Sequence, residues 1–176
     1  MHDIIIIGAG MAGMSAALTA VKLKLKTLLV AKEFSVLKVG ATELNLFDAK
    51  KMQKELIKVT ENSAQFFELH LKQEVTSLEK NVISFSVETK SGQTFYAKSV
   101  IICSGENSVT HEGNTAFDLT AFKDFKNKIK VDAQMATNVP GLFAGGSVLS
   151  GAPGNSVTSV GEGSRAVLSA KVFLKS

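Results

Sequence analysis

Apolar residues gather in short runs along the chain, and the first run predicts how the fold begins. Four isoleucines at 4–7 lead directly into a glycine-rich turn at 8–13. A continuous apolar run of this kind is typical of a strand buried on both faces, and the uncharged stretch after it predicts a helix over 12–23. A second apolar run at 26–30 predicts a parallel strand. These segments together predict a βαβ unit.

The middle of the chain changes from helical spacing to strand alternation. Residues 48–59 have the caps and the apolar spacing of a helix. Apolar and polar side chains then alternate in three segments, 74–78, 82–88 and 93–97. Lys90-Ser91-Gly92 has the composition of a hairpin turn, and the apolar run at 98–103 predicts another buried strand.

The last third of the chain repeats the order of strand, glycine loop and helix. A turn at 138–141 leads into a short apolar strand at 142–144, and a glycine-rich loop follows. A long helix is expected from about Asn155 to Leu174. Gly161 and Gly163 in its first turns predict a close backbone neighbour, since glycine inside a helix costs about 1 kcal/mol relative to alanine. The free N–H groups at its start favour developing negative charge.

The turn at 8–13 has the glycine spacing of a dinucleotide cradle. Gly8 permits a tight turn, Gly10 lets backbone N–H groups approach a pyrophosphate, and Gly13 with Ala17 brings the helix close to the strand. A glycine turn without a ligand is the alternative. In such cradles an acidic residue ends the second strand and binds the adenosine ribose. Here Ala31 stands at that place and is followed by Lys32 and Glu33, so Glu33 either reaches the ribose or is an exposed glutamate.

Composition limits the remaining possibilities. The 176 residues, 45% of them hydrophobic, suit one domain. Residues 4–21 carry no charge, but their glycines, Ser15 and Thr19 argue against a membrane span, and the absence of a leader makes the cytoplasm the expected compartment. The net charge of +4 comes from lysines in two groups, at 22–26 and 123–130, which we interpret as solvated faces rather than a nucleic-acid surface.

Side chains that carry chemistry are few. Cys103 is the only cysteine, which excludes an internal disulfide, a Cys-x-x-Cys pair and a thiolate metal site within one chain. Its apolar run predicts a small buried hydrophobic side chain rather than a reactive thiol. His2, His70 and His111 are scattered and are expected to be structural or solvated. No catalytic triad, carboxylate pair or metal-ligand set is visible.

Taken together, these motifs resemble the FAD domain of the thioredoxin reductase branch of the flavoprotein disulfide reductases. The turn from Gly8 through Gly10, Met11 and Ala12 to Gly13 is similar to the FAD pyrophosphate fingerprint. The sequence 138–146 is similar to the second FAD signature, and 158–163 to the helix on the flavin side. Cys103, Ser104 and Gly105 stand at the family's Ala-Thr-Gly strand end. The resemblance implies an α/β fold of the Rossmann-like FAD-binding type, with a parallel sheet, flanking helices and a small antiparallel β-meander.

The resemblance also implies roles for other residues. Glu74-Val75 would lie against the adenine, with Val75 contributing backbone groups, and Asn45 would lie beside the isoalloxazine. Gly146 and Ser147 would follow the ribityl chain. Asn155, Ser156 and Val157 would face the pyrimidine edge of the flavin. For Asn45 a turn asparagine, and for Ser156 a simple N-cap, are the alternatives.

Two departures from that family change the expected chemistry. A thioredoxin reductase inserts an NADPH domain with a Cys-x-x-Cys motif where this chain has only residues 106–128, so the parent disulfide chemistry is excluded and 1–176 is expected to be one FAD-binding domain. Ser147 replaces the aspartate that holds the ribityl chain. We expect a flavoprotein oxidoreductase whose external donor is a nicotinamide or a partner protein. The alternative is a non-enzymatic module or redox sensor that binds FAD or another adenine nucleotide, with a homodimer interface as one location for the ligand.

Overall fold

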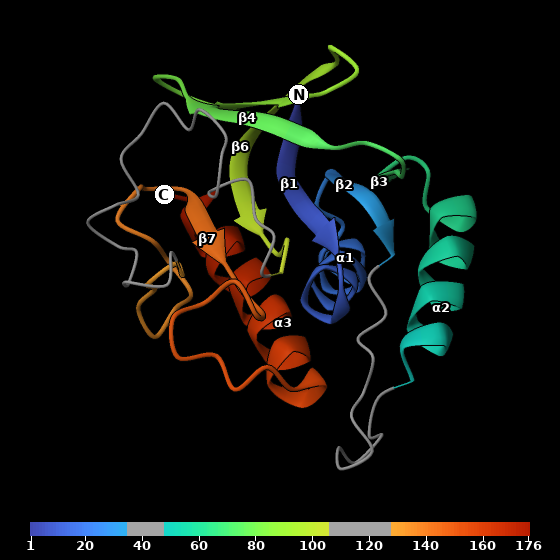
Figure 1. Ribbon diagram of the computed structural model, residues 1–176. Helices are drawn as coiled ribbons and strands as arrows, with labels where there is room; N and C mark the ends of the chain where they lie inside the picture. Colours follow the sequence, from blue (N-terminus) through green and yellow to red (C-terminus); the bar gives the residue numbers. More distant parts are fainter. Residues whose placement is uncertain (35–47, 106–127) are drawn as a thin grey trace.

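The computed structural model describes residues 1–34, 48–105 and 128–176 (Figure 1). Within these ranges it has seven strands and three helices. In chain order they are β1 (His2–Ala9), α1 (Met11–Lys22), β2 (Thr27–Phe34), α2 (Ala49–Asn62), β3 (Phe67–His70), β4 (Val75–Lys80), β5 (Phe85–Thr89), β6 (Thr94–Ile102), β7 (Leu142–Ala144) and α3 (Ser156–Phe173).

All seven strands belong to one sheet with the order β3-β2-β1-β6-β5-β4, and β7 pairs with β6 beside this path. The pairs β3–β2, β2–β1, β1–β6 and β6–β7 are parallel, whereas β6–β5 and β5–β4 are antiparallel. The chain therefore has the expected α/β fold, a parallel sheet flanked by helices with a small antiparallel meander (Figure 1). The βαβ unit predicted at the N-terminus is confirmed as β1, α1 and β2.

Strand β6 corrects one sequence-based expectation. Two strands were predicted, at 93–97 and 98–103, but Thr94–Ile102 is one strand that changes partners along its length. Its first half pairs with β5, and its second half lies between β1 and β7. A change of partner leaves no break in the alternation of side chains, so the sequence did not distinguish one long strand from two. The hairpin turn before it is confirmed, with Gly92 at φ 81°.

The isoleucine run is buried because both faces of the sheet are covered. Ile4 and Ile6 belong to the cluster that packs under α1 and α3, whereas Ile5 and Ile7 pack with Leu78 and Phe85 of the meander. Successive side chains of a strand point to opposite faces, so an all-apolar strand needs a cover on each side. Helices provide one cover and the meander provides the other (Figure 1).

Strand β3 and helix α2 form one edge of the molecule. The helix begins after Asp48, whose carboxylate accepts the N–H groups of Lys50 and Lys51, and it ends three residues later than expected, at Asn62. Strand β3 was not predicted, because four residues with two polar side chains give little periodicity.

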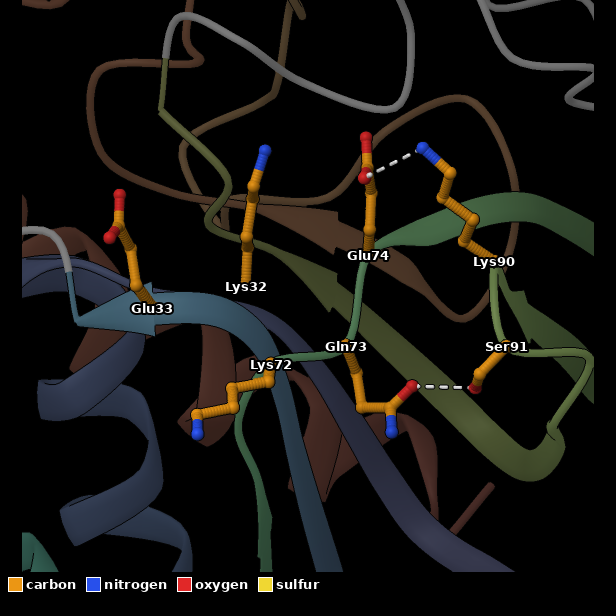
Figure 2. A pocket seen from close by; sticks show the side chains of 7 residues that line it. All are labelled: Lys32, Glu33, Lys72, Gln73, Glu74, Lys90 and Ser91. Carbon is orange, nitrogen blue, oxygen red and sulfur yellow. Dashed lines mark hydrogen bonds and ion pairs between the residues drawn. The ribbon is translucent and has the colours of Figure 1, made fainter.

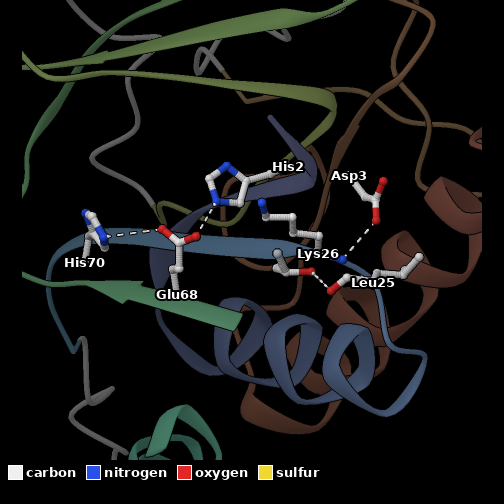
Figure 3. A network of polar contacts seen from close by, with 7 residues as sticks. His2, Asp3, Leu25, Lys26, Glu68 and His70 are labelled. Carbon is white, nitrogen blue, oxygen red and sulfur yellow. Dashed lines mark hydrogen bonds and ion pairs between the residues drawn. The ribbon is translucent and has the colours of Figure 1, made fainter. Parts of the chain in front are cut away.

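The two histidines in the described ranges have structural roles, as expected (Figure 3). Nε2 of His2 donates to Oε1 of Glu68 at 3.1 Å, and Nε2 of His70 lies 3.8 Å from Oε2 of the same carboxylate. The edge of the His70 ring also packs against Phe95. These contacts join the start of β1 to β3, while His111 lies outside the described residues. In the described ranges, none of the helices is long and apolar enough to cross a membrane.

Candidate dinucleotide-binding site

The turn after β1 contains two glycines at positions where a side chain would collide with the protein's own backbone. Gly8 has φ 104°, and a Cβ there would lie 2.5 Å from the carbonyl oxygen of Cys103. A Cβ on Gly13 would collide with the carbonyl oxygen of Gly8. Any side chain at either position would force α1 away from β1 and β6. The predicted roles of Gly8 in the turn and Gly13 in close packing therefore follow from the geometry.

Gly10 differs from both, because nothing in the described protein explains it. Its φ of −79° is open to any residue, and a Cβ built there meets no atom of residues 1–34, 48–105 or 128–176 within 4 Å. Gly10 is the N-cap of α1, where the helix has no side-chain cap and no acidic residue in its first turn. The N–H groups of Met11, Ala12 and Gly13 thus begin a helix whose partial positive charge faces open space at Gly10. This arrangement fits an anionic ligand whose atoms approach the backbone.

The end of β6 adds a polar group to the same place. Ser104 has its Cα 2.8 Å from the position of a Cβ on Gly8, and its Oγ is buried with no hydrogen-bond partner in the described part of the chain. A buried hydroxyl without a hydrogen-bond partner destabilises the fold unless a ligand or a water molecule supplies the missing hydrogen bond. Together with Gly10, this orphaned hydroxyl indicates a binding site rather than a simple turn.

Cys103 is not a reactive group. Its side chain is buried, and burial, followed by the charge of Glu162, raises the pKa of the thiol to about 12, although the N–H of Gly145 acts in the opposite direction. The thiolate is the nucleophilic form, so this thiol is inert near neutral pH. The expectation of a small buried hydrophobic side chain is confirmed.

The second glycine turn meets the first at α1. Gly146 has φ 87°, and a Cβ there would lie 2.9 Å from the Cβ of Ala12. A Cβ on Gly105 would lie 3.7 Å from Oγ of Ser147, so the ends of β6 and β7 are neighbours. The Nζ of Lys128 donates to the carbonyl oxygen of Ser147 at 2.6 Å and fixes this turn from outside.

Helix α3 begins where the second glycine loop ends. Asn155 is its N-cap and accepts the N–H of Thr158 at 2.8 Å, so the N-cap interpretation of Ser156 is wrong. Ser156 is buried as the first helical residue, whereas Val157 is exposed. Asn155 was expected to face a flavin, but its side-chain oxygen is already used by the helix, which leaves its amide nitrogen for a ligand.

Only one of the two helix glycines behaves as predicted. A Cβ on Gly163 would collide with the carbonyl oxygen of Ala12, which explains how α3 packs closely against α1. Gly161 is exposed, and a Cβ there would meet no atom within 4 Å. The expectation of a close backbone neighbour at Gly161 is therefore wrong for the described residues.

Glu162 is a site residue that sequence reasoning missed. Its Oε2 accepts the N–H of Gly146 at 2.8 Å, and its backbone carbon would lie 3.2 Å from a Cβ on Gly145. Burial raises the pKa of this carboxyl, and the hydrogen bond from Gly146 partly offsets the rise. Its one sequence signal is that it is the only acidic residue of α3 and stands between two glycines.

The other predicted residues lie at a separate, open end of the site (Figure 2). Ala31 is the last buried residue of β2, and Lys32 and Glu33, which follow it in the same strand, are exposed. A hollow of about 590 Å³ lies there, lined by Lys32, Glu33, Lys72, Gln73, Glu74, Lys90 and Ser91.

A backbone hydrogen bond and a side-chain ion pair bring the walls of this hollow together. The N–H of Lys72 donates to the carbonyl oxygen of Lys32 at 3.1 Å, and Nζ of Lys90 lies 3.7 Å from Oε2 of Glu74. Val75 begins β4 directly after Glu74, so the residues predicted for the ribose and the adenine border one hollow. Asn45 lies outside the described residues. No group of three or more His, Cys, Asp or Glu side chains in the described ranges could hold a metal ion.

A parallel sheet with two glycine turns at the carboxyl ends of its strands defines a dinucleotide-binding α/β protein. The chain belongs to the pyridine nucleotide-disulphide oxidoreductase family, whose model matches residues 2–116 and, in a second match, 49–163. Members of this family are flavoproteins that typically bind FAD. A search of curated proteins found no match.

Solved structures of thioredoxin reductases share the fold, which confirms the resemblance drawn from the sequence. The T. acidophilum enzyme matches with a TM-score of 0.76 and 18% identity, and the Lactococcus lactis enzyme with 0.76 and 17%, each over 99% of both chains. A ferredoxin-flavin thioredoxin reductase from Clostridium acetobutylicum matches with a TM-score of 0.73 and 19% identity, over 99% of this chain and 97% of that chain.

Proposed function

We propose that residues 1–176 form a single FAD-binding domain that passes electrons between an external donor and an acceptor still to be identified. The observation that carries this proposal is Gly10. Neither its φ nor the described residues around it call for glycine, yet it stands in front of the uncapped N-terminus of α1. A ligand that brings a negative charge to the backbone at this point, such as a diphosphate, accounts for it.

The residues around α1 have the chemistry to hold FAD along its length. The N–H groups of Met11, Ala12 and Gly13 would face the diphosphate, and the orphaned Oγ of Ser104 would donate to it. Ser147 would meet the ribityl chain. At the open end, Glu33 and the backbone at Val75 would meet the adenosine, with Lys32 beside them.

The start of α3 suits the flavin end. When bound, FAD would supply the electron chemistry, because its ring accepts and releases electrons. The N-terminus of α3, with the amide of Asn155, Ser156 and the exposed Val157, would favour negative charge on that ring. Asn45 is proposed to lie there from the resemblance alone.

The donor is proposed to be external to this domain. The printed sequence has one dinucleotide fingerprint, at 8–13, and we assign it to FAD. One similar structure is named a ferredoxin-flavin thioredoxin reductase, so a protein donor is a reasonable alternative to free nicotinamide. Disulfide exchange is not proposed, since the thiol of Cys103 is buried and its pKa is about 12.

Anaerobic reduction of the FAD-loaded protein tests this function. Positioning of a nicotinamide can lower a hydride-transfer barrier by several kcal/mol, and the printed sequence has no second glycine fingerprint to provide it. We expect NADPH and NADH to reduce the flavin slowly and in proportion to their concentration, while dithionite reduces it fully. Saturation at micromolar NADPH with turnover above roughly 1 s⁻¹ would identify a self-sufficient nicotinamide oxidoreductase instead. A flavin that dithionite cannot reduce would rule out an electron-transfer role and leave a structural ligand.

A further inference from the structure

Glu162 places a carboxylate at the junction of both glycine turns. Its Oε2 holds the N–H of Gly146 at 2.8 Å, and a Cβ on Gly146 would lie 2.9 Å from the Cβ of Ala12, in the first turn of α1. The next residue, Gly163, packs directly on the backbone of Ala12. A protein carboxylate therefore binds Gly146, and Gly146 is a direct neighbour of the first turn of α1, which is proposed to bind a diphosphate.

The fold does not need this charge. Burial raises the pKa of the Glu162 carboxyl, so the folded state holds its proton more tightly than the unfolded state. For an acid shifted in this direction, stability falls as pH rises from the unfolded pKa through the folded pKa. The ionised carboxylate thus costs stability at neutral pH. A glutamine could accept the same N–H of Gly146 without that cost, so the charge itself calls for another explanation.

The groups around Glu162 leave its charge largely uncompensated in the described ranges. Directly after β6, the Cys103 thiol interacts electrostatically with Glu162, and this thiol stays neutral below pH about 12. The first turn of α1 carries no ionisable side chain, and the next charged residue on α3, Arg165, is exposed. Lys128 is the cation on the adjoining turn, and its Nζ is bound to the carbonyl oxygen of Ser147.

We propose that Glu162 couples FAD binding to proton uptake. The inference rests on the proposed function, because it needs the FAD diphosphate to lie at the N-terminus of α1. The arriving anion repels the carboxylate, which takes a proton from solvent, while its carbonyl oxygen keeps the N–H of Gly146. FAD affinity then falls as pH rises, by at most about tenfold per pH unit for one proton. The fall in affinity begins above the pKa that the Glu162 carboxyl has in the FAD-free protein, which burial raises from 4.5.

Calorimetric titration of the apoprotein with FAD at pH 5.5, 6.5, 7.5 and 8.5, at constant ionic strength, tests the inference. Wild type should bind about fivefold more weakly at the highest pH than at the lowest. Its binding enthalpy in two buffers of different ionisation enthalpy should reveal net proton uptake. Glu162→Gln should remove most of the pH dependence and bind roughly fivefold more tightly than wild type at the highest pH, as expected for loss of one partly screened repulsion. Glu61→Gln, at an exposed position of α2, is the matched control and should behave as wild type.

Two results would overturn the inference while leaving FAD binding intact. One is an equal pH dependence in wild type and Glu162→Gln, and the other is wild-type binding without proton uptake. If Glu162→Gln fails to fold, the two-buffer experiment on wild type still decides, and Glu162→Asp should retain proton uptake. Failure of FAD to bind at any pH would instead contradict the proposed function.

Discussion

The two ends of the candidate site are built in opposite ways. At the α1 end, backbone packs on backbone, and Gly8, Gly13, Gly146 and Gly163 each occupy a place that a side chain would disturb. At the β2 end, an open hollow is lined by long charged side chains, and Lys32 and Glu33 are exposed. The shape of the α1 end is therefore fixed by backbone packing. The shape of the β2 end depends on exposed side chains, which can change conformation. Substitutions should therefore have large effects at α1 and small effects at β2.

The largest effect is expected within the turn before α1. There, the same change from glycine to alanine should destabilise the fold at Gly13 and leave it nearly unchanged at Gly10. Gly13→Ala drives a Cβ into the carbonyl oxygen of Gly8 and should lower the free energy of unfolding by about 3 kcal/mol or more. Gly10→Ala places its Cβ in open space and should change stability by less than about 1 kcal/mol. Urea denaturation of both variants measures the difference. Equal losses would show that Gly10 is also a packing glycine.

The second-largest effect is expected on FAD affinity, with the stability of the fold unchanged. Gly10→Val should fold normally, since φ of −79° suits valine, but its side chain would fill the space in front of α1. We expect FAD affinity to fall at least about a hundredfold, or ~2.7 kcal/mol. Fluorescence titration with FAD gives the affinity, and the melting temperature without FAD is the control. Retained FAD in a folded Gly10→Val protein would move the diphosphate away from this turn.

An intermediate effect is expected at Ser147, which borders the end of β6. Ser147→Asp supplies an ionised acceptor for a ribityl hydroxyl, and such hydrogen bonds are roughly twice as strong as neutral ones. FAD should bind up to about tenfold more tightly, or ~1.4 kcal/mol, as measured by retention of flavin on dilution. Ser150→Asp, on the same loop, serves as the control. Faster loss of flavin from Ser147→Asp would show that the ribityl chain does not pass this residue.

The smallest effect is expected at the open end. Glu33→Gln removes a charge from an exposed side chain whose hydrogen bond to a ribose would be partly replaced by water. We expect a loss of FAD affinity of about threefold, or ~0.7 kcal/mol, by the same titration. A hundredfold loss would mean that this end is as tightly specified as the α1 turn.

The difference between the two ends also explains how much could be predicted from the sequence. Gly8 and Gly13 follow a fixed spacing set by local backbone geometry, so the turn, α1 and the parallel sheet were predictable. Glu162 was not, because its partner is Gly146, which lies on another element and becomes a neighbour only after the chain folds. Gly161 and Gly163 are identical in sequence terms, and only the position of α1 distinguishes them. Strand β3 pairs through its backbone and leaves almost no pattern in its side chains.

Identification of the ligand that the protein retains tests the assignment of the α1 turn most directly. The purified wild-type protein, or apoprotein reconstituted with a mixture of FAD, FMN and NADP⁺, should be desalted and heated, and the released nucleotides separated and counted. We predict stoichiometric FAD, because the turn at Gly10 presents backbone N–H groups to a diphosphate, which FMN lacks, and because members of the family typically bind FAD. Stoichiometric FMN, a retained nicotinamide dinucleotide, or no bound nucleotide at all would contradict it.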